Sequence, residues 1–405
     1  LVVDLDKSLI RTDYLHECLI NYFSKSLLAP IILLMVIIRD GKIGLKKFLY
    51  KKSEISVKNL PYDEKVLAYI KNWKKEKNGK IFLVSASFEN AVNEIAEYLD
   101  CFDGSYGTCD INLKSNNKLS KINEIRKDQP FTYIGDSYDD LVIWKDASLC
   151  TLVNPTRKLK NKVKKLNNRI YILDSKKNLF NEVFKTIRVH QWIKNCLLFV
   201  PAILIFENDY LTITNLINGF FAFSFVASAF YILNDLFDIE NDRRHETKNK
   251  RSFASGYLSI TSGLWVFIFL ILFAVTIAFK LPSAFQLCLV LYAISTFLYS
   301  KYLKKIAIVD IFILSYLYLL RVLTGGVLIS ATISNWLLTF SVFFFLFLAS
   351  VKRWIEIKKI DTDSIPGREY TAIDISFIRQ ISYFSGLISV LIICLYIDSQ
   401  QAQAL

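Results

Sequence analysis

The uneven distribution of apolar residues restricts the possible folds of this chain more than any other feature. Residues 195–400 contain seven apolar stretches that are long enough, or nearly so, to cross a bilayer, whereas residues 1–190 are rich in charge and contain one long apolar run. A membrane-spanning helix needs about 20 mainly apolar residues. The sequence therefore predicts a soluble N-terminal domain followed by a multi-span helical membrane domain.

The connections between the predicted spans alternate in charge. The spans are predicted at residues 195–207, 212–234, 262–279, 284–299, 310–328, 335–351 and 377–397. Lys and Arg are concentrated before the first span and in every second connection after it, whereas the other connections contain only Lys280. Because basic loops stay on the cytoplasmic side, we expect a multi-pass protein of the inner (cytoplasmic) membrane whose N-terminal domain is cytoplasmic.

This topology also accounts for the overall charge and for the cysteines. The net charge of +13 comes from Lys and Arg placed between apolar runs, so the positive-inside rule explains it without nucleic acid as a partner. The seven cysteines show no paired spacing, and we expect them to be reduced.

Three predicted strands in the N-terminal domain each end in a polar motif. Asp4 and Asp6 follow the first strand, Ser85 follows a strand at 81–84, and a strand at 131–134 leads to Asp136 and Asp140. Helical patterns at 63–77, 88–99 and 118–127 separate these motifs. Strands that alternate with helices predict a parallel sheet covered on both faces, and such sheets bind ligands at the carboxyl ends of their strands.

With these three motifs and Lys118 in order along the chain, residues 1–155 resemble the haloacid-dehalogenase-like (HAD) phosphatases. The resemblance implies that Asp4 is the nucleophile, Asp6 the general acid and base, and Ser85 a ligand of the phosphoryl oxygens. It further implies that Lys118 neutralises the phosphate charge and that Asp4, Asp136 and Asp140 hold Mg²⁺. Lys7 and Ser8 occupy positions where the family usually has Gly and Thr. This departure leaves open a phosphatase domain that has lost its activity.

A small helical cap over this site is expected at residues 10–60. The apolar run 30–38 within it is too short to span a bilayer. It is either the core of the cap or a patch that rests on the membrane surface, and we favour the core.

The strongest chemical signal of the second half lies at the cytoplasmic end of the second predicted span. Asp235, Asp238 and Asp242 are spaced i, i+3 and i+7, so a continuous helix would place them on one face. Three carboxylates at a membrane boundary repel one another unless a divalent cation binds them, and Mg²⁺ bound to a diphosphate is a natural partner. Arg243, Lys248 and Arg251 follow at a spacing suited to phosphate oxygens.

This motif resembles the first aspartate-rich motif of the UbiA prenyltransferase superfamily, and the resemblance covers residues 185–400. It implies a helical membrane bundle, usually of nine spans, so we expect spans beyond the seven predicted ones. Three local patterns resemble the branch that transfers phosphoribose to a polyprenyl phosphate. They are residues 188–195, the pattern Asp242-Arg243-x-His245-x-x-Lys248-x-x-Arg251, and Tyr299-Ser300-x-x-x-Lys304 followed by Asp310 and Arg321.

The resemblance implies a Mg²⁺-dependent phosphoribosyltransferase that uses 5-phosphoribosyl 1-diphosphate and a polyprenyl phosphate and releases pyrophosphate. The three aspartates of the motif would hold the metal. The residues expected to bind substrates are Lys194, Asn234, Arg243, Lys248, Arg251, Lys304, Asp310 and Arg321. The fused phosphatase domain fits this branch, because a phosphoribosylated lipid offers a 5-phosphate to remove.

Two alternatives stay open at this point. The membrane domain could be an aromatic prenyltransferase that makes a quinone or haem precursor, and the HAD-like domain could be a regulatory, non-catalytic module. The expected domains are a HAD-like domain at 1–155, a basic linker at 156–187 and a UbiA-type domain at 188–405.

Overall fold

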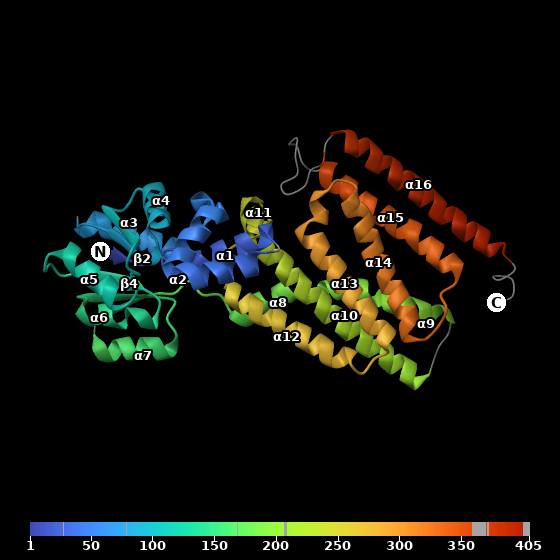
Figure 1. Ribbon diagram of the computed structural model, residues 1–405, viewed down its shortest axis with the longest axis horizontal. Coiled ribbons are helices and arrows are strands. Elements are labelled where there is room, and N and C mark those ends of the chain that lie inside the picture. Colours follow the sequence, from blue (N-terminus) through green and yellow to red (C-terminus); the bar gives the residue numbers. More distant parts are fainter. Residues whose placement is uncertain are drawn as a thin grey trace. The chain divides into compact units, whose positions relative to one another are not determined.

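The computed structural model describes residues 1–26, 28–77, 79–167, 169–205, 209–358, 370 and 372–399. The chain divides into two compact units (Figure 1). Unit 1 combines Leu1–Val183 with Asp235–Gly263, and unit 2 combines Phe184–Asn234 with Leu264–Leu405. The phosphatase-like half of the sequence thus forms one body with a segment taken from the second half.

A six-stranded parallel sheet with the order β3-β2-β1-β4-β5-β6 forms the centre of unit 1. Its strands are β1 (Val2–Val3), β2 (Phe82–Phe88), β3 (Gly104–Thr108), β4 (Thr132–Gly135), β5 (Leu149–Val153) and β6 (Ile170–Leu173). Successive residues of β1 enter different cores: Val3 packs with Leu83 and Ile134, whereas Val2 packs with Val84 and Tyr133. The sheet is therefore buried on both faces, which explains its continuous apolar strands.

Helices cover the sheet as the sequence pattern predicts. They are α3 (Glu64–Lys77), α4 (Glu89–Leu99), α5 (Asn116–Arg126), α6 (Leu141–Asp146) and α7 (Arg157–Leu166), with short 3-10 turns at η1 (Val57–Asn59) and η2 (Tyr138–Asp140). The turn η2 carries Asp140 directly beyond the end of β4. The layered architecture thus brings the polar motifs to one edge of the sheet.

The sequence predicts a basic linker at 156–187, but its described residues, 156–167 and 169–187, contain regular elements. These are α7, β6 and α8 (Leu179–Ile187), and β6 pairs with β5. Leu159 and Val163 of α7 are buried in the core, while the lysines around them face solvent. The high lysine content led to the prediction of a linker, but the segment includes an amphipathic helix. Such a helix needs an apolar residue only at every third or fourth position.

Two helices, α1 (Tyr14–Lys25) and α2 (Ala29–Ser53), form the cap, and α2 is kinked at Gly41, where φ is +63°. The apolar run of α2 divides between two environments. Leu33 and Val36 are buried, whereas Leu34 and Ile38 are 59% and 76% exposed. The prediction that this run is cap core is right for one face of the helix and wrong for the other.

The second segment of unit 1 begins where α10 (Tyr210–Phe237) ends. It contains α11 (Ile239–Arg244), the turn η4 (Lys248–Lys250) and a loop that leads to Gly263. Gly256 adopts a φ of +73°, and a Cβ there would lie 2.7 Å from Cβ of Arg11. The backbone of the loop therefore lies too close to Arg11 for a side chain at position 256. Both this contact and the positive φ favour glycine there.

Unit 2 consists of helices and connecting loops in its described residues. It contains η3 (Val189–Phe199), α9 (Val200–Ile205), most of α10, α12 (Ile260–Ala278), α13 (Ser283–Lys301), η5 (Leu303–Lys305), α14 (Val309–Leu328), α15 (Asn335–Lys358) and α16 (Ala372–Ile397). Six helices of the described chain, namely α10, α12, α13, α14, α15 and α16, are long and apolar enough to cross a membrane.

The first of the seven predicted spans is not one long helix. Its described residues form the 3-10 segment η3 and the six-residue helix α9, with Pro201 near the start of α9. Proline lacks the amide donor that a continuous helix would need there. The fold class is nevertheless confirmed: a parallel α/β domain is joined to a multi-span helical membrane domain.

Candidate functional site

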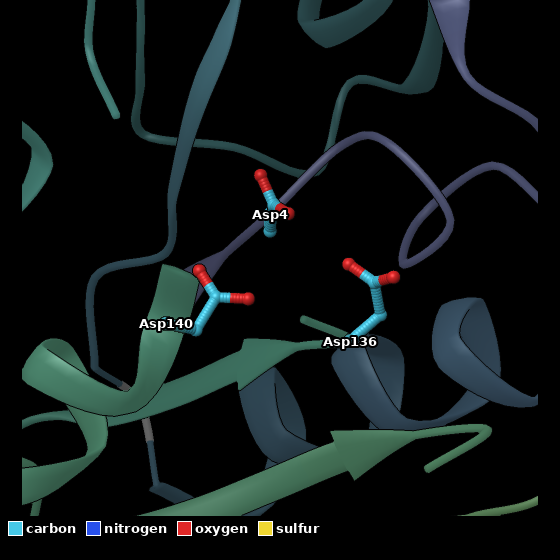
Figure 2. A group of neighbouring side chains, drawn as sticks. All are labelled: Asp4, Asp136 and Asp140. Atoms are coloured by element: carbon cyan, nitrogen blue, oxygen red, sulfur yellow. The ribbon is translucent and has the colours of Figure 1, made fainter. Parts of the chain in front are cut away.

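Three aspartates converge at the carboxyl edge of the sheet. Asp4 follows β1, Asp136 follows β4 and Asp140 ends η2. Figure 2 shows the three side chains as neighbours. Each offers a carboxylate oxygen, and these oxygens lie within 4.8 Å of one another. The backbone amide of Asp4 donates to the carbonyl of Ile134 at 3.0 Å, which ties the first aspartate to the neighbouring strand.

Lys118 is the cation of this group. Its Nζ lies 2.7 Å from Oδ1 of Asp4 and 3.9 Å from Oδ1 of Asp140. It also donates to the hydroxyl of Tyr133 at 3.1 Å, and that hydroxyl donates to Asp140 at 2.7 Å. Lys118 and Asp140 are both buried, so the position of each charge is fixed by neighbours rather than by solvent.

Burial and mutual repulsion raise the pKa of two of the three carboxylates. Burial raises the pKa of Asp4 to about 7, with Lys118 opposing and Asp140 and Asp6 adding to the increase. Burial followed by repulsion from Asp4 and Asp140 also raises the pKa of Asp136 well above its usual value. A hard divalent cation bound by oxygen ligands would relieve this repulsion, so the donor set fits Mg²⁺.

Asp6 belongs to the same edge but has different partners. Its Oδ1 accepts the backbone amide of Tyr14 at 2.7 Å, at the start of cap helix α1. Its Oδ2 accepts the hydroxyls of Ser85 at 3.2 Å and Ser87 at 2.8 Å. The turn after β1 therefore separates Asp4 and Asp6 into different hydrogen-bond networks, and the predicted phosphoryl contact of Ser85 stays a prediction.

Lys7 adopts a left-handed backbone conformation with φ of +55°. This conformation costs an L-residue roughly 1–2 kcal/mol, a cost that glycine avoids. The lysine that replaces the usual glycine is therefore accommodated by the fold, but at the expense of backbone strain.

The group opens into a cleft of about 370 Å³. Lys7, Lys46, Lys114 and Lys118 line it together with the aspartates. Lys46 comes from cap helix α2, and its Nζ donates to Oδ1 of Asn112 at 2.7 Å. A cleft with carboxylates on one wall and ammonium groups around it suits a phosphomonoester accompanied by a divalent cation.

The sequence reasoning did not find Lys46, Ser87 and Tyr133. Ser87 lies two residues after Ser85 in the same strand, so strand alternation could have indicated it. Lys46 and Tyr133 belong to elements whose sequence contains no polar motif at those positions, and only the fold brings them to the aspartates.

The second group of aspartates, also in unit 1, does not lie on one continuous helix. Helix α10 ends at Phe237, and Asp238 precedes α11 with non-helical dihedral angles. Asp235 and Asp242 are buried and converge on Arg251, whose Nη1 lies 3.1 Å and 2.8 Å from their carboxylates. The predicted i, i+3, i+7 face is thus wrong as a geometry, because the helix breaks between the first and the last aspartate.

Arg243 points to a different partner from the one expected. Its Nη2 and Nη1 donate to the carboxylate of Glu17 in α1 at 2.6 Å and 3.2 Å, and its Nε donates to the carbonyl of Ala254 at 2.9 Å. Both charged side chains are almost fully buried. A guanidinium held in this way binds the cap helix rather than an open phosphate site, whereas Lys248 of the same motif is exposed.

Unit 2 buries a second arginine inside its helices. Nε of Arg321 donates to Asn195 at 2.9 Å, and its Nη2 donates to the hydroxyl of Tyr292 at 3.0 Å. Asn195 in turn donates to Ser224 at 2.9 Å. The network holds the positive charge of Arg321 inside the bundle rather than at a helix end.

Lys194 lies in the electrostatic field of other cations of unit 2. Burial, together with the charges of Lys352, Arg321 and Arg188, lowers the pKa of Lys194 to about 8. A lysine surrounded by other cations in this way favours an anionic ligand such as a diphosphate.

Two further predicted residues have defined neighbours. Nζ of Lys304 donates to Oδ1 of Asn234 at 3.1 Å. Asp310 is fully buried, lies 2.5 Å from Nη2 of Arg353 and accepts the hydroxyl of Tyr370. This buried ion pair connects α14 with α15, so Asp310 holds Arg353 rather than facing an open site.

Known proteins match either about half of the chain or nearly all of it. The sequence profile of the UbiA prenyltransferase family matches residues 196–400. An uncharacterised protein of Sinorhizobium fredii is 35% identical over 378 residues, which cover 91% of this chain and 72% of that protein. The decaprenyl-phosphate phosphoribosyltransferase of Mycobacterium tuberculosis is 33% identical over 185 residues, which cover 44% of this chain and 61% of that enzyme.

Two solved structures resemble parts of the chain in fold. A UbiA homologue from Archaeoglobus fulgidus bound to GPP and Mg²⁺ covers 54% of this chain and 79% of its own, with 14% identity and a TM-score of 0.48. A phosphoserine phosphatase in its apo form covers 45% of this chain and 96% of its own, with 21% identity and a TM-score of 0.32.

Proposed function

This chain belongs to the UbiA prenyltransferase family, and we propose that its membrane domain transfers phosphoribose from 5-phosphoribosyl 1-diphosphate to a polyprenyl phosphate. The observation that carries the proposal is the cation group of unit 2. Lys194 shares its environment with Arg188, Arg321 and Lys352, which suits a donor and an acceptor that are both phosphorylated. The name of the mycobacterial relative supports the same branch.

In this proposal the aspartate-rich segment handles the donor. Asp235, Asp238 and Asp242 would hold Mg²⁺, which supplies positive charge to the departing diphosphate. Arg251, already paired with Asp235 and Asp242, and exposed Lys248 supply cations for the phosphate oxygens. An oxygen of the lipid phosphate attacks the anomeric carbon of ribose, the carbon–oxygen bond to diphosphate breaks, and a phosphodiester forms.

The phosphatase-like site then acts on the 5-phosphate of the transferred sugar. Asp4 attacks phosphorus and forms an aspartyl-phosphate, while Asp6 donates a proton to the leaving sugar oxygen. Asp6 next accepts a proton from the water that hydrolyses the aspartyl-phosphate. Lys118 neutralises charge beside Asp4, and Asp4, Asp136 and Asp140 are the residues that would hold Mg²⁺.

The charge pattern of the loops supports an orientation for the chain. The multi-pass membrane domain would lie in the inner membrane, with the phosphatase domain and the basic loops in the cytoplasm. Both phosphorylated substrates would then be used on the side where a soluble sugar diphosphate is available.

A paired transfer assay tests the proposal. Purified protein with Mg²⁺ receives either phosphoribosyl diphosphate with a polyprenyl phosphate, or a prenyl diphosphate with 4-hydroxybenzoate. We expect lipid-linked phosphoribose in the first reaction only, and its loss in Asp235→Asn but not in the exposed control Asp209→Asn. Product in the second reaction alone would replace this function by aromatic prenyl transfer.

A further inference from the structure

A second hollow lies beside the phosphatase-like site within unit 1. It encloses about 400 Å³ and shares Lys7 and Asp136 with the cleft that contains Asp4. A ligand whose phosphoryl group lies at Asp4 can therefore extend into this neighbouring hollow, which we call the basic cleft.

Positive charge dominates the basic cleft. Lys7, Arg11, Lys176 and Lys177 line it, against one lining carboxylate, Asp136. Behind the wall, Nε of Arg11 lies 3.5 Å from Asp63, and Nζ of Lys176 donates to the carbonyl of Pro155 at 2.9 Å. Even with Asp63 included, cations outnumber carboxylates two to one.

Two of these cations, Arg11 and Lys177, lie over the ring of Tyr257. Nζ of Lys177 lies 3.8 Å from the centre of the Tyr257 ring, and Cζ of Arg11 lies 4.7 Å from the same centre. Two like charges that share one ring stay close to each other despite their repulsion. Such a pair is prepared for an anion that neutralises both.

The loop after the second aspartate group closes the cleft. Gly256 and Tyr257 belong to this loop, and Gly256 contacts Arg11 closely, as the 2.7 Å separation of its hypothetical Cβ shows. The basic cleft therefore consists of residues from both segments of unit 1. The phosphatase-like fold alone would lack this wall.

Lys7 connects the cleft with the catalytic edge. It lines both hollows and keeps a positive φ of 55° where glycine would be unstrained. A strained position that retains a charged side chain at the junction of two clefts indicates that the charge has a use there.

We propose that the basic cleft binds a second phosphate of the phosphatase substrate, so that this domain selects sugar phosphates with two separate phosphate groups. The proposal rests on the proposed function, in which the product lipid has a 5-phosphate and a phosphodiester at carbon 1. The 5-phosphate would lie at Asp4 and the phosphodiester in the basic cleft.

The test compares two soluble substrates with the full-length protein and Mg²⁺. We expect the kcat/KM for phosphate release to be higher for ribose 1,5-bisphosphate than for ribose 5-phosphate. The double variant Lys176→Gln, Lys177→Gln should reduce this ratio roughly tenfold, as expected for the loss of charge-assisted contacts. The matched control Lys164→Gln, Lys165→Gln, on exposed positions of α7, should keep the wild-type ratio.

Binding measurements keep this test separate from that of the proposed function. If neither compound is hydrolysed, the phosphatase proposal fails, but calorimetry still reports whether ribose 1,5-bisphosphate binds more tightly than ribose 5-phosphate. A preference that disappears in the double variant supports the cleft. Equal binding of the two compounds overturns the proposed second phosphate site, and so does a preference that the double variant retains. Inorganic phosphate that binds as tightly as ribose 1,5-bisphosphate would overturn it as well.

Discussion

The two groups of aspartates in unit 1 balance their charges differently. Asp4, Asp136 and Asp140 bring carboxylate oxygens close together, and Lys118 forms ion pairs with Asp4 and Asp140. Asp235 and Asp242 instead converge on one guanidinium, that of Arg251. The first group is arranged for a cation as it stands, whereas the second needs Arg251 to exchange its carboxylates for a phosphate. If the second group binds the proposed donor diphosphate, Arg251 would have to leave Asp235 and Asp242 before these carboxylates could hold a cation.

The largest effect is expected at the preorganised group. Asp4→Asn removes the nucleophile while keeping its shape, so phosphate release should fall by at least about 10³-fold. Lipid-linked phosphoribose should still form, because the transfer chemistry does not use Asp4. Phosphate release and radiolabelled lipid product, measured on one preparation, check both statements. Asp146→Asn, an exposed change on α6, serves as the control, and unchanged phosphate release in Asp4→Asn would remove this aspartate from the mechanism.

Changes in the second group, Asp235 and Asp242, should lower transfer activity and not phosphate release. Asp242→Asn removes a carboxylate from the pair that faces Arg251, so transfer should fall on the order of 10²-fold. Phosphate release from ribose 5-phosphate should stay near the wild-type rate. A variant that loses both activities equally would mean that the two groups form one functional site, and the comparison would break.

The ion pair between Glu17 and Arg243 should determine how firmly the second group is held. Glu17→Gln leaves a buried guanidinium without its counter-charge, which typically costs about 3 kcal/mol. A lower midpoint of thermal unfolding for the detergent-solubilised protein is the expected readout. Glu54→Gln, which removes an exposed ion pair with Lys25, should shift the midpoint little. Equal shifts of the unfolding midpoint in the two variants would show that the buried ion pair stabilises the protein no more than the exposed one.

The smallest effect is expected from the hydroxyl that connects Lys118 with Asp140. Tyr133→Phe removes two hydrogen bonds but no charge, and phosphate release should fall about tenfold. The required Mg²⁺ concentration should rise in parallel, because Asp140 loses an orienting donor. Tyr138→Phe, at an exposed position, should change neither quantity.

The sequence predicted one of these groups better than the other for a physical reason. Asp4, Asp136 and Asp140 follow strands of a parallel sheet, and the carboxyl ends of such strands meet at one edge whatever the details of packing. Asp235 and Asp242 required a continuous helix, and the break at Asp238 cancelled that assumption.

Long-range pairings were beyond the reach of the sequence. Glu17 and Arg243 are separated by 226 positions, and no sequence motif links the two residues. The same holds for Arg321 and Asn195, which meet inside unit 2. Periodicity identifies the elements, but a buried ion pair depends on how the elements pack.

Unit 1 is discontinuous: residues 184–234 leave it and the chain then returns. A gene cut after residue 183 would therefore not yield two independent proteins. The C-terminal fragment would keep Arg243 and lose Glu17, while the N-terminal fragment would lose the loop that includes Tyr257. Unit 1 therefore needs both parts of the chain. Activity from separately expressed halves would depend on their association with each other.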